Sequence, residues 1–253
     1  METIKLEKTD SVAKITFSKP PLNILNAADF VCLEKILKEL RKDKNLKLIV
    51  FDSDQKVFSA GVDIDEHRPE KISEVIKAFN GMFLALIESE IPTLALVKAL
   101  CAGGGSEFAL FCDFVLASEN ACFAQPEIKL GCFPPLSIVH LPYLTGNKKA
   151  LELILTGEKI SAKEALKAGL VNHVFSEEEF EEKISKFIDL ITYNSSAVIR
   201  STLKTYKKIN YSDLKEKIEL AEKVFVEELV NLEDYSEGID SFFEKRPPEW
   251  KGR

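Results

Sequence analysis

Residues 103–113 read Gly-Gly-Gly-Ser-Glu-Phe-Ala-Leu-Phe-Cys-Asp, a glycine triplet followed by a short and strongly apolar segment. The pattern predicts a helix that begins at the glycines and is buried on most of its faces. Glu107 lies within this helix, where a carboxylate is costly unless it is paired or takes part in chemistry. The start of a helix also leaves backbone N–H groups unpaired and partially positive. Such a site can hold a developing oxyanion.

A second carboxylate and a loop of small residues accompany this segment. Glu127 follows twenty residues after Glu107, within the short stretch Gln125-Pro126-Glu127. Upstream, the continuous apolar run 47–51 is typical of a strand buried on both faces. The loop Ser59-Ala60-Gly61-Val62-Asp63 comes shortly after this run and offers small residues and a backbone amide. We therefore expect the two glutamates and this loop to carry the chemistry.

Four motifs resemble, in order, those of the enoyl-CoA hydratase/isomerase family, also called the crotonase superfamily, over nearly the whole chain. The loop at 59–63 resembles the family's first oxyanion segment, and residues 103–113 resemble the second. Residues 123–131 resemble the segment that carries the second catalytic glutamate. Residues 155–165, followed by Gly169-Leu170-Val171, match a structural signature of the family. A lone glycine triplet would be weak evidence for this family, but four motifs in the same order and at compatible spacings are specific to it.

The resemblance implies an α/β fold with a crotonase-like ββα spiral core. It assigns residues 1–195 to the catalytic core and residues 196–253 to a C-terminal helical region. In the family, helices of this region pack into a trimer and form part of the acyl pocket. We therefore expect the partner of the chain to be its own copies, in a homotrimer or a dimer of trimers.

The resemblance also implies a hydro-lyase that adds water to a double bond conjugated with a coenzyme A thioester. The backbone amides of Val62 and Gly104 would form the oxyanion hole, where negative charge collects on the thioester oxygen. Glu107 would hold and deprotonate the attacking water, and Glu127 would deliver a proton to carbon. Burial and repulsion between like charges both raise a carboxylate pKa, which can keep one of the two protonated near neutral pH.

Contacts with the acyl-CoA are expected on both sides of this machinery. Asp63 and Asp65 would shape their loop or contact the adenine end of the substrate. No metal or redox cofactor is implied, since coenzyme A is part of the substrate. The residues expected to bind the acyl-CoA are Ala60, Asp63, Ile64, Asp65, Gly103, Phe133, Pro134, Pro135 and Leu136.

The chain departs from the family pattern after Gly131. Many members continue with a proline and a glycine-rich turn, whereas residues 132–140 read Cys-Phe-Pro-Pro-Leu-Ser-Ile-Val-His. Stiff and bulky residues beside Glu127 indicate an apolar, rigid pocket. Together with Pro20-Pro21-Leu22-Asn23-Ile24-Leu25, this segment resembles hydratases of cyclic dienoyl-CoA thioesters from anaerobic aromatic degradation. The substrate expected from this resemblance is cyclohexa-1,5-diene-1-carbonyl-CoA, which takes up water in a 1,4 sense to give a hydroxycyclohexene-carbonyl-CoA.

Other functions stay open at this point. A straight-chain 2-enoyl-CoA hydratase of fatty-acid or amino-acid breakdown is the main enzymatic alternative. Isomerisation or thioester hydrolysis is a different reaction class that the same oxyanion hole would support, although two retained glutamates favour hydration. A non-catalytic scaffold or an RNA-binding relative on this fold is the alternative outside enzymology. The two glutamates and the acidic net charge argue against it.

Composition and charge narrow the class of protein. The 253 residues are 45% hydrophobic and 30% charged, as in an ordinary globular protein with a large core. A net charge of −7 and a pI near 5.3 argue against nucleic acid as the main partner. The five cysteines form no metal-ligand spacing, which favours reduced, buried thiols. Residues 1–5 lack the apolar core of a signal peptide and no apolar run is long enough to span a bilayer, so we expect a cytoplasmic protein without membrane association.

Strand and helix patterns alternate along the first half of the chain, and the second half is mainly helical. The alternation indicates a layered α/β core, with strands at 4–7, 13–17 and 93–97. Asn26 is the expected N-cap of the first helix, and Ser161 with Glu164 forms an expected capping box. The longer helices are expected at residues 26–42, 70–88, 177–192, 195–208 and 212–231.

The three histidines are too scattered in the sequence to indicate a metal site or a nucleophilic triad. We expect His67 in a surface loop and His173 within the structural signature, while a place for His140 in the acyl pocket stays open. Near the end of the chain, Phe242-Phe243 and Lys245 resemble the family's terminal helix. Packing in the core and contact with coenzyme A are both open for these residues.

Overall fold

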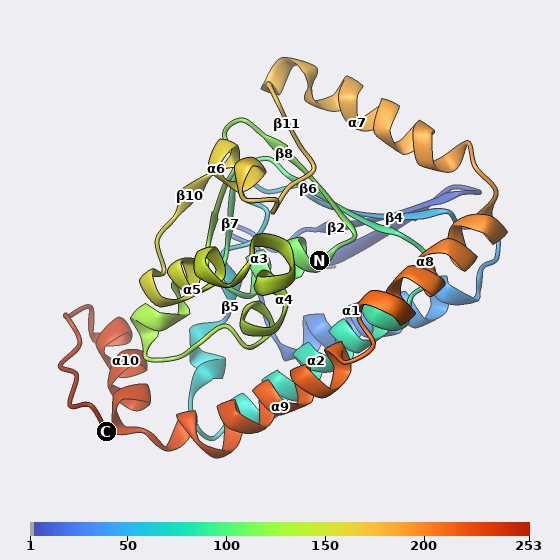
Figure 1. Ribbon diagram of the computed structural model, residues 1–253. Helices are drawn as coiled ribbons and strands as arrows, with labels where there is room; N and C mark the ends of the chain where they lie inside the picture. Colours follow the sequence, from blue (N-terminus) through green and yellow to red (C-terminus); the bar gives the residue numbers. More distant parts are fainter. Residues whose placement is uncertain (1–2) are drawn as a thin grey trace.

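The computed structural model describes residues 3–253, in which a six-stranded sheet is packed between helices (Figure 1). The strand order in this sheet is β1-β2-β4-β6-β8-β11. A short turn joins β1 to β2, so that pair is antiparallel, and the other neighbouring strands of the sheet are parallel. The strands are β1 (Ile4–Lys8), β2 (Val12–Phe17), β4 (Leu48–Ser53), β6 (Thr93–Val97), β8 (Phe114–Ser118) and β11 (His173–Phe175).

Two small sheets carry the segments that the sequence singles out. In one of them β9 pairs with β7 in parallel and with β10 antiparallel, and in the other β3 pairs with β5 in parallel. A parallel bridge between Ser59 and Cys101 ties the loop before β5 to β7, which leads into the glycine triplet. These strands are β3 (Ile24–Leu25), β5 (Gly61–Val62), β7 (Leu100–Ala102), β9 (Cys122–Ala124) and β10 (Ile160–Ser161).

Helices connect the strands and then continue beyond the last of them. Helices α1 and α2 pack against each other. The α-helices are α1 (Ala27–Lys42), α2 (Ile72–Glu88), α3 (Gly104–Phe111), α4 (Pro135–Thr145), α5 (Asn147–Thr156), α6 (Ala162–Lys167), α7 (Glu177–Thr192), α8 (Ser196–Asn210), α9 (Leu214–Glu227) and α10 (Glu233–Glu244). The 3₁₀ helices in the described part of the chain are η1 (Ile64–His67), η2 (Pro126–Leu130) and η3 (Leu229–Asn231). The predicted α/β class is therefore confirmed.

The main core is rich in phenylalanine and encloses α3. The ring of Phe108 lies edge to face against Phe17 and Phe51 of the large sheet and against Phe83 of α2. All four of these side chains are fully buried. Such edge-to-face contacts add to the free energy gained by burying the rings. The prediction that α3 is buried on most of its faces is confirmed.

A smaller apolar cluster packs on the opposite face of the sheet. Leu48 and Val50 of β4 contact Phe180 and Ile184 of α7 there. Phe51, the next residue of β4, belongs to the main core. Because successive residues of a strand point to opposite faces, β4 is buried on both sides. Its continuous apolar sequence predicted this arrangement.

Two predicted helix starts are confirmed by reciprocal hydrogen bonds. Oδ1 of Asn26 accepts from the N–H of Asp29, and Oδ2 of Asp29 accepts from the N–H of Asn26, each over 3.0 Å. Ser161 and Glu164 make the same type of capping box at the start of α6. Ser195 occupies the N-cap position of α8 but makes no side-chain capping hydrogen bond.

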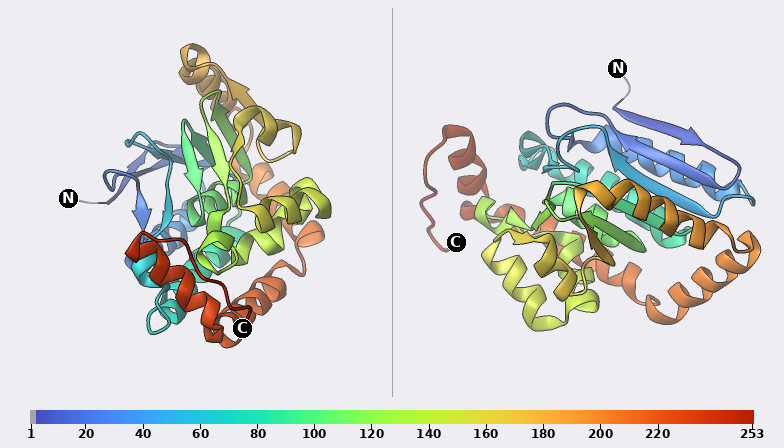
Figure 2. Two further views of the ribbon diagram at one scale, coloured as in Figure 1. Left: turned by 90° about the vertical axis from the view of Figure 1, so that its left-hand side faces the viewer. Right: turned by 90° about the horizontal axis from the view of Figure 1, so that it is seen from above.

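The C-terminal helices return to the body of the molecule. Helix α9 packs against α2 and α4, and α10 packs against η2. The final residues run back beside α10, where the carboxylate of Asp234 accepts hydrogen bonds from the N–H groups of Lys251 and Gly252 (Figure 2). The division of the chain at residue 195 stays a prediction.

Residues 1–5, which we expect not to form a signal peptide, are only partly described, since residues 1 and 2 lie outside the range of the structure. Within residues 3–253, no helix is both long enough and apolar enough to cross a membrane. The cytoplasmic location stays a prediction.

Candidate active site

The start of α3 and the loop before β5 are in close contact. The N–H of Ala102 donates a 3.0 Å hydrogen bond to the carbonyl of Ser59. A Cβ atom added to Gly105 would lie 2.6 Å from Oγ of Ser59, and one added to Gly104 would lie 2.6 Å from Cγ2 of Val62. Side-chain carbons do not approach other atoms so closely. The glycine triplet is therefore required for these two segments to pack together.

Gly103 turns the chain from β7 into α3. Its backbone angles, φ 55° and ψ −139°, are rarely adopted by residues other than glycine. Gly104 is the first residue of α3, so its N–H has no acceptor within its own helix. The two amides predicted to form an oxyanion hole, those of Val62 and Gly104, thus belong to segments in direct contact.

Glu107 lies one turn into α3 and is bound by the start of another helix. Its side chain is buried, and Oε1 accepts hydrogen bonds from the backbone N–H groups of Leu136 at 2.8 Å and Ser137 at 2.7 Å. Both donors lie in the first turn of α4. Burial raises the pKa of Glu107 to about 7, although these hydrogen bonds favour its charged form and oppose the increase.

Glu127 lies at the start of η2 and is buried without a comparable set of donors. Its Oε1 lies near Gly103, where a Cβ atom would be 3.2 Å away. Its Oε2 is buried and has no hydrogen-bond partner within residues 3–253. Burial, together with the charge of Glu107, holds the pKa of Glu127 well above its usual range.

The surroundings of the two carboxyl groups favour different protonation states. Glu107 is stabilised as an anion by two backbone donors, whereas ionised Glu127 would leave one oxygen without a partner. The first proton lost by the pair therefore comes mainly from Glu107, and Glu127 keeps its proton to higher pH. One ionised and one protonated carboxyl group is the arrangement that a general base and a general acid need.

Both glutamates line a cavity of about 240 Å³. Its wall includes nine of the residues predicted for the site, and most of the remaining wall is apolar. The nine are Ala60, Val62, Ile64, Gly103, Gly104, Glu107, Glu127, Phe133 and Pro135.

Four residues predicted to bind substrate do not contribute to this wall. The carboxylate of Asp63 accepts from the N–H of Asp65 and caps η1, while Asp65 pairs with Arg68 and Lys71. Pro134 and Leu136 are buried, and Leu136 reaches the site through its backbone N–H. Their contact with substrate stays a prediction.

Sequence reasoning missed several parts of the cavity wall. His67, which was expected in a surface loop, lies in η1 and lines the cavity, where it is half-buried. Phe79 of α2, Phe225 of α9 and Phe242 of α10 complete the aromatic part of the wall. The resemblance placed helices of the C-terminal region at the acyl pocket and left a contact of Phe242 with coenzyme A open, but the sequence did not single out Phe79 or Phe225.

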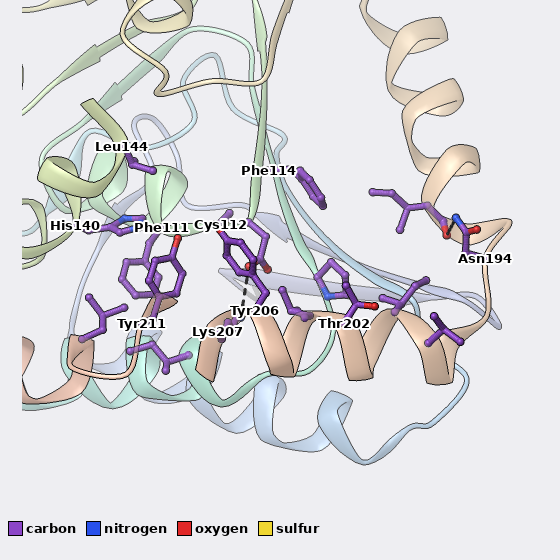
Figure 3. Close-up of a pocket in the computed structure, with 18 of the residues that line it drawn as sticks. Phe111, Cys112, Phe114, His140, Leu144, Asn194, Thr202, Tyr206, Lys207 and Tyr211 are labelled. Atoms are coloured by element: carbon purple, nitrogen blue, oxygen red, sulfur yellow. Dashed lines mark hydrogen bonds and ion pairs between the residues drawn. The ribbon is translucent and has the colours of Figure 1, made fainter. Parts of the chain in front are cut away.

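His140 does not line the cavity that contains the glutamates. It faces a separate cavity of about 620 Å³ between α4, α7 and α8 (Figure 3). The imidazole packs against Phe111 and Tyr211, and burial lowers its pKa to about 4. The question that the sequence left open for His140 is thus answered by its position.

Within residues 3–253, no group of three His, Cys, Asp or Glu side chains is arranged to hold a metal ion.

Comparison with known proteins decides the family. Residues 7–253 match the family model described as enoyl-CoA hydratase/isomerase. The chain belongs to this family. Its members act on acyl-CoA thioesters, and this chain is accordingly an enoyl-CoA hydratase-type lyase.

Individual relatives agree with this assignment. Cyclohexa-1,5-dienecarbonyl-CoA hydratase of Thauera aromatica is 29% identical over 98% of this chain and 96% of its own length. A probable mitochondrial enoyl-CoA hydratase of Dictyostelium discoideum is 33% identical over 99% of this chain and 91% of its own. The crystal structure of an enoyl-CoA hydratase from Mycobacterium avium subsp. paratuberculosis superposes with a TM-score of 0.89 at 26% identity, covering 99% of each chain. The crotonase fold predicted from the sequence is confirmed, and the non-catalytic alternative is set aside.

Proposed function

We propose that this enzyme hydrates a compact, cyclic dienoyl-CoA thioester, cyclohexa-1,5-diene-1-carbonyl-CoA, by 1,4-addition. The observation that carries the proposal is the small cavity of about 240 Å³, lined by aromatic and aliphatic side chains and by the two glutamates. Phe133 and Pro135, from the segment that departs from the family pattern, lie in this wall. A flat apolar ring suits aromatic walls, while a long acyl chain would need more room. The similarity to the Thauera aromatica protein supports the same substrate.

The thioester oxygen would lie between the amides of Val62 and Gly104. When water adds to the conjugated system, negative charge moves onto this oxygen and gives an enolate. Two backbone donors fixed in advance stabilise this charge more than they stabilise the neutral substrate. Loss of one such donor costs on the order of 3 kcal/mol of transition-state stabilisation.

The glutamates would move the protons. Ionised Glu107 takes a proton from water as the oxygen forms its bond to carbon, and the electron pair of the double bond moves toward the thioester. Protonated Glu127 then gives its proton to carbon, which converts the enolate into the neutral product and leaves Glu127 ionised. The hydrogen bonds from Leu136 and Ser137 support the ionised state of Glu107, and the unpaired oxygen of Glu127 supports its protonated state.

A second candidate is hydration of a straight-chain 2-enoyl-CoA. The similarity to the Dictyostelium discoideum protein favours it. The machinery would be the same, and the acyl group alone would differ. An isomerase would use the same oxyanion hole but would move a double bond without taking up water.

We propose further that the enzyme is a homotrimer or a dimer of trimers. Large apolar side chains on α7, α8 and α9 support this assembly, because they would otherwise face water. The most exposed are Leu190, Tyr193, Val198, Ile209 and Leu220. Sedimentation equilibrium tests the proposal, and a monomer at micromolar concentration would contradict it.

A direct comparison of two substrates tests the proposed function. Purified enzyme is given cyclohexa-1,5-diene-1-carbonyl-CoA or crotonyl-CoA, and uptake of one water is followed by mass. We expect a higher kcat/KM for the cyclic diene. Faster hydration of crotonyl-CoA would make the straight-chain candidate correct, and a product of unchanged mass would indicate an isomerase.

A further inference from the structure

The active-site cavity contains a polar group that the proposed chemistry does not use. Of the described residues in its wall, polar side-chain atoms come from five: His67, Glu107, Glu127, Lys129 and Cys132. The two glutamates carry the proton transfers, Lys129 pairs with Glu158, and the thiol of Cys132 donates to the backbone carbonyl of Glu127. The imidazole of His67 is therefore a neutral hydrogen-bonding group in an otherwise largely apolar wall.

The hydrogen bonding of His67 defines which of its ring nitrogens carries a proton. Nδ1 lies 2.9 Å from the backbone carbonyl of Asp63. A carbonyl oxygen can only accept, so Nδ1 carries the hydrogen, and in the neutral ring Nε2 has a free lone pair. Within residues 3–253 Nε2 has no hydrogen-bond partner. Burial lowers the pKa of His67 and so favours this neutral form.

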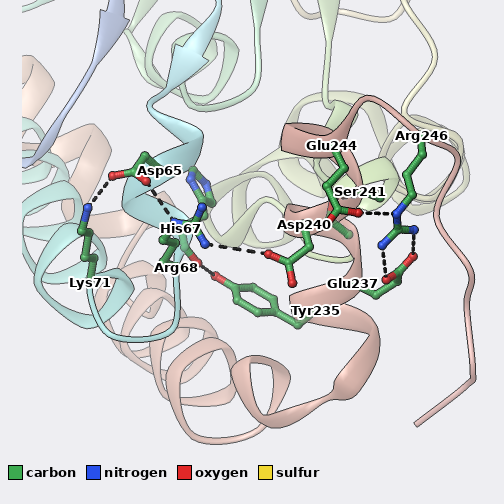
Figure 4. A network of polar contacts seen from close by, with 11 residues as sticks. Asp65, His67, Arg68, Lys71, Tyr235, Glu237, Asp240, Ser241, Glu244 and Arg246 are labelled. Carbon is green, nitrogen blue, oxygen red and sulfur yellow. Dashed lines mark hydrogen bonds and ion pairs between the residues drawn. The ribbon is translucent and has the colours of Figure 1, made fainter.

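Contacts from α10 hold the segment that carries this ring (Figure 4). The hydroxyl of Tyr235 donates a hydrogen bond to the backbone carbonyl of His67. The next residue, Arg68, lies 3.8 Å from Asp240 and 4.9 Å from the ring centre of Phe243. These contacts join the end of η1 to α10. They fix the backbone of His67, so its ring is positioned before a ligand arrives.

We propose that Nε2 of His67 accepts a hydrogen bond from a hydroxyl group on the acyl part of the thioester, and so makes the pocket prefer hydroxyacyl-CoA over its deoxy analogue. This inference rests on the proposed function, because hydration creates a hydroxyl group that is absent from the substrate. After the reaction Glu107 carries the proton taken from water and is no longer a free anion. Glu127 is ionised once it has given its proton to carbon, and besides this carboxylate Nε2 is the neutral side-chain nitrogen of the wall that can accept from the new hydroxyl group.

Binding measurements in the Glu127→Gln background separate this role from turnover. Isothermal titration calorimetry compares 2-hydroxycyclohexane-1-carbonyl-CoA with cyclohexanecarbonyl-CoA, and 3-hydroxybutyryl-CoA with butyryl-CoA. With His67 present, we expect the hydroxylated member of at least one pair to bind about three- to tenfold more tightly, as one neutral hydrogen bond allows.

Two substitutions of His67 form the matched test. His67→Asn keeps a donor near the position of Nδ1 but has no atom at Nε2, so the preference should fall to about onefold while the deoxy ligand binds as before. His67→Gln places an amide oxygen near Nε2 and should restore part of the preference.

An unchanged preference for the hydroxylated ligand in His67→Asn would overturn the proposal. Equally weaker binding of both ligands would also overturn it, because Nε2 would then accept from the pantetheine chain that both ligands share. Thermal melts identify a variant that fails to fold. If His67→Asn does not fold, the same two ligands are compared on His67→Gln. Loss of binding to both ligands by folded His67→Gln would also contradict the proposal. Failure of the proposed substrate would show separately, as absence of hydration by the wild-type enzyme.

Discussion

The backbone N–H of Ser137 donates a 2.7 Å hydrogen bond to Oε1 of Glu107. The N–H of Leu136 reaches the same oxygen at 2.8 Å. Both groups belong to the first turn of α4, whose unpaired N–H groups and dipole favour an anion. The segment that departs from the family pattern therefore stabilises the carboxylate that we propose as the general base.

The rate of hydration should depend on pH with an acid limb near 7. Glu107 must be ionised to act as a base, and its pKa is raised to about 7. Glu127 must be protonated, and its pKa is raised well above the usual range. The active form carries one proton on the pair, so kcat/KM should rise as pH increases through about 7 and fall at higher pH. A pH profile without an acid limb would contradict this assignment.

Removal of one N–H donor from Glu107 should move the acid limb to higher pH. Ser137→Pro deletes the amide hydrogen, and loss of a hydrogen bond to the charged form raises a carboxylate pKa. We expect a shift of about one to two pH units. Ser137→Ala keeps the N–H and removes only the hydroxyl group, which lowers the pKa of Glu107 less than the N–H does, so the limb should shift less. Indistinguishable profiles in the two folded variants would argue against the backbone donor.

A side chain at Gly104 should disrupt the oxyanion hole. A Cβ atom there would lie 2.6 Å from Val62 and push the two segments apart. Gly104→Ala should therefore lower kcat by about 100-fold or more. Gly81→Ala is the matched control, because its Cβ would meet the flexible end of Glu34, 3.0 Å away. If steady-state kinetics show similar turnover in both variants, the amide of Gly104 is not a catalytic donor.

Truncation of the ring beside Glu107 should weaken the fold. Phe108 is fully buried and packs against rings from the large sheet and from α2. Phe108→Ala should lower the free energy of unfolding by about 3–5 kcal/mol. Leu151→Ala on the exposed face of α5 should change it by less than about 0.5 kcal/mol. Denaturant unfolding measures both, and equal effects would mean that the core around α3 is loosely packed.

Features encoded within a few residues could be predicted from the sequence. Asn26 with Asp29 and Ser161 with Glu164 are three residues apart, so each capping box is visible in the sequence. The apolar run of β4 predicted burial on both faces for a similar reason, since a strand alternates its side chains. The glycine triplet before Glu107 indicated a close approach of backbone, and the expected oxyanion hole paired it with the loop at 59–63.

Features that depend on distant contacts could not be predicted in the same way. The donors to Glu107 come from Leu136 and Ser137, about thirty residues along the chain. His67 looks like a residue of a polar loop, and only the packing of α10 through Tyr235 shows what holds it in the cavity wall. Phe225 reaches the cavity from a helix whose periodicity predicts a buried face but not its neighbour.

The central claim is that Glu107 and Glu127 together carry out hydration. Single-turnover incorporation of ¹⁸O from labelled water tests it most directly, with wild type, Glu107→Gln and Glu127→Gln on the preferred enoyl-CoA. We predict that wild type forms labelled hydroxyacyl-CoA, whereas each variant does so at least about 100-fold more slowly while binding saturated acyl-CoA and melting as wild type does. A folded variant that incorporates label at close to the wild-type rate would remove that glutamate from the mechanism and contradict the account.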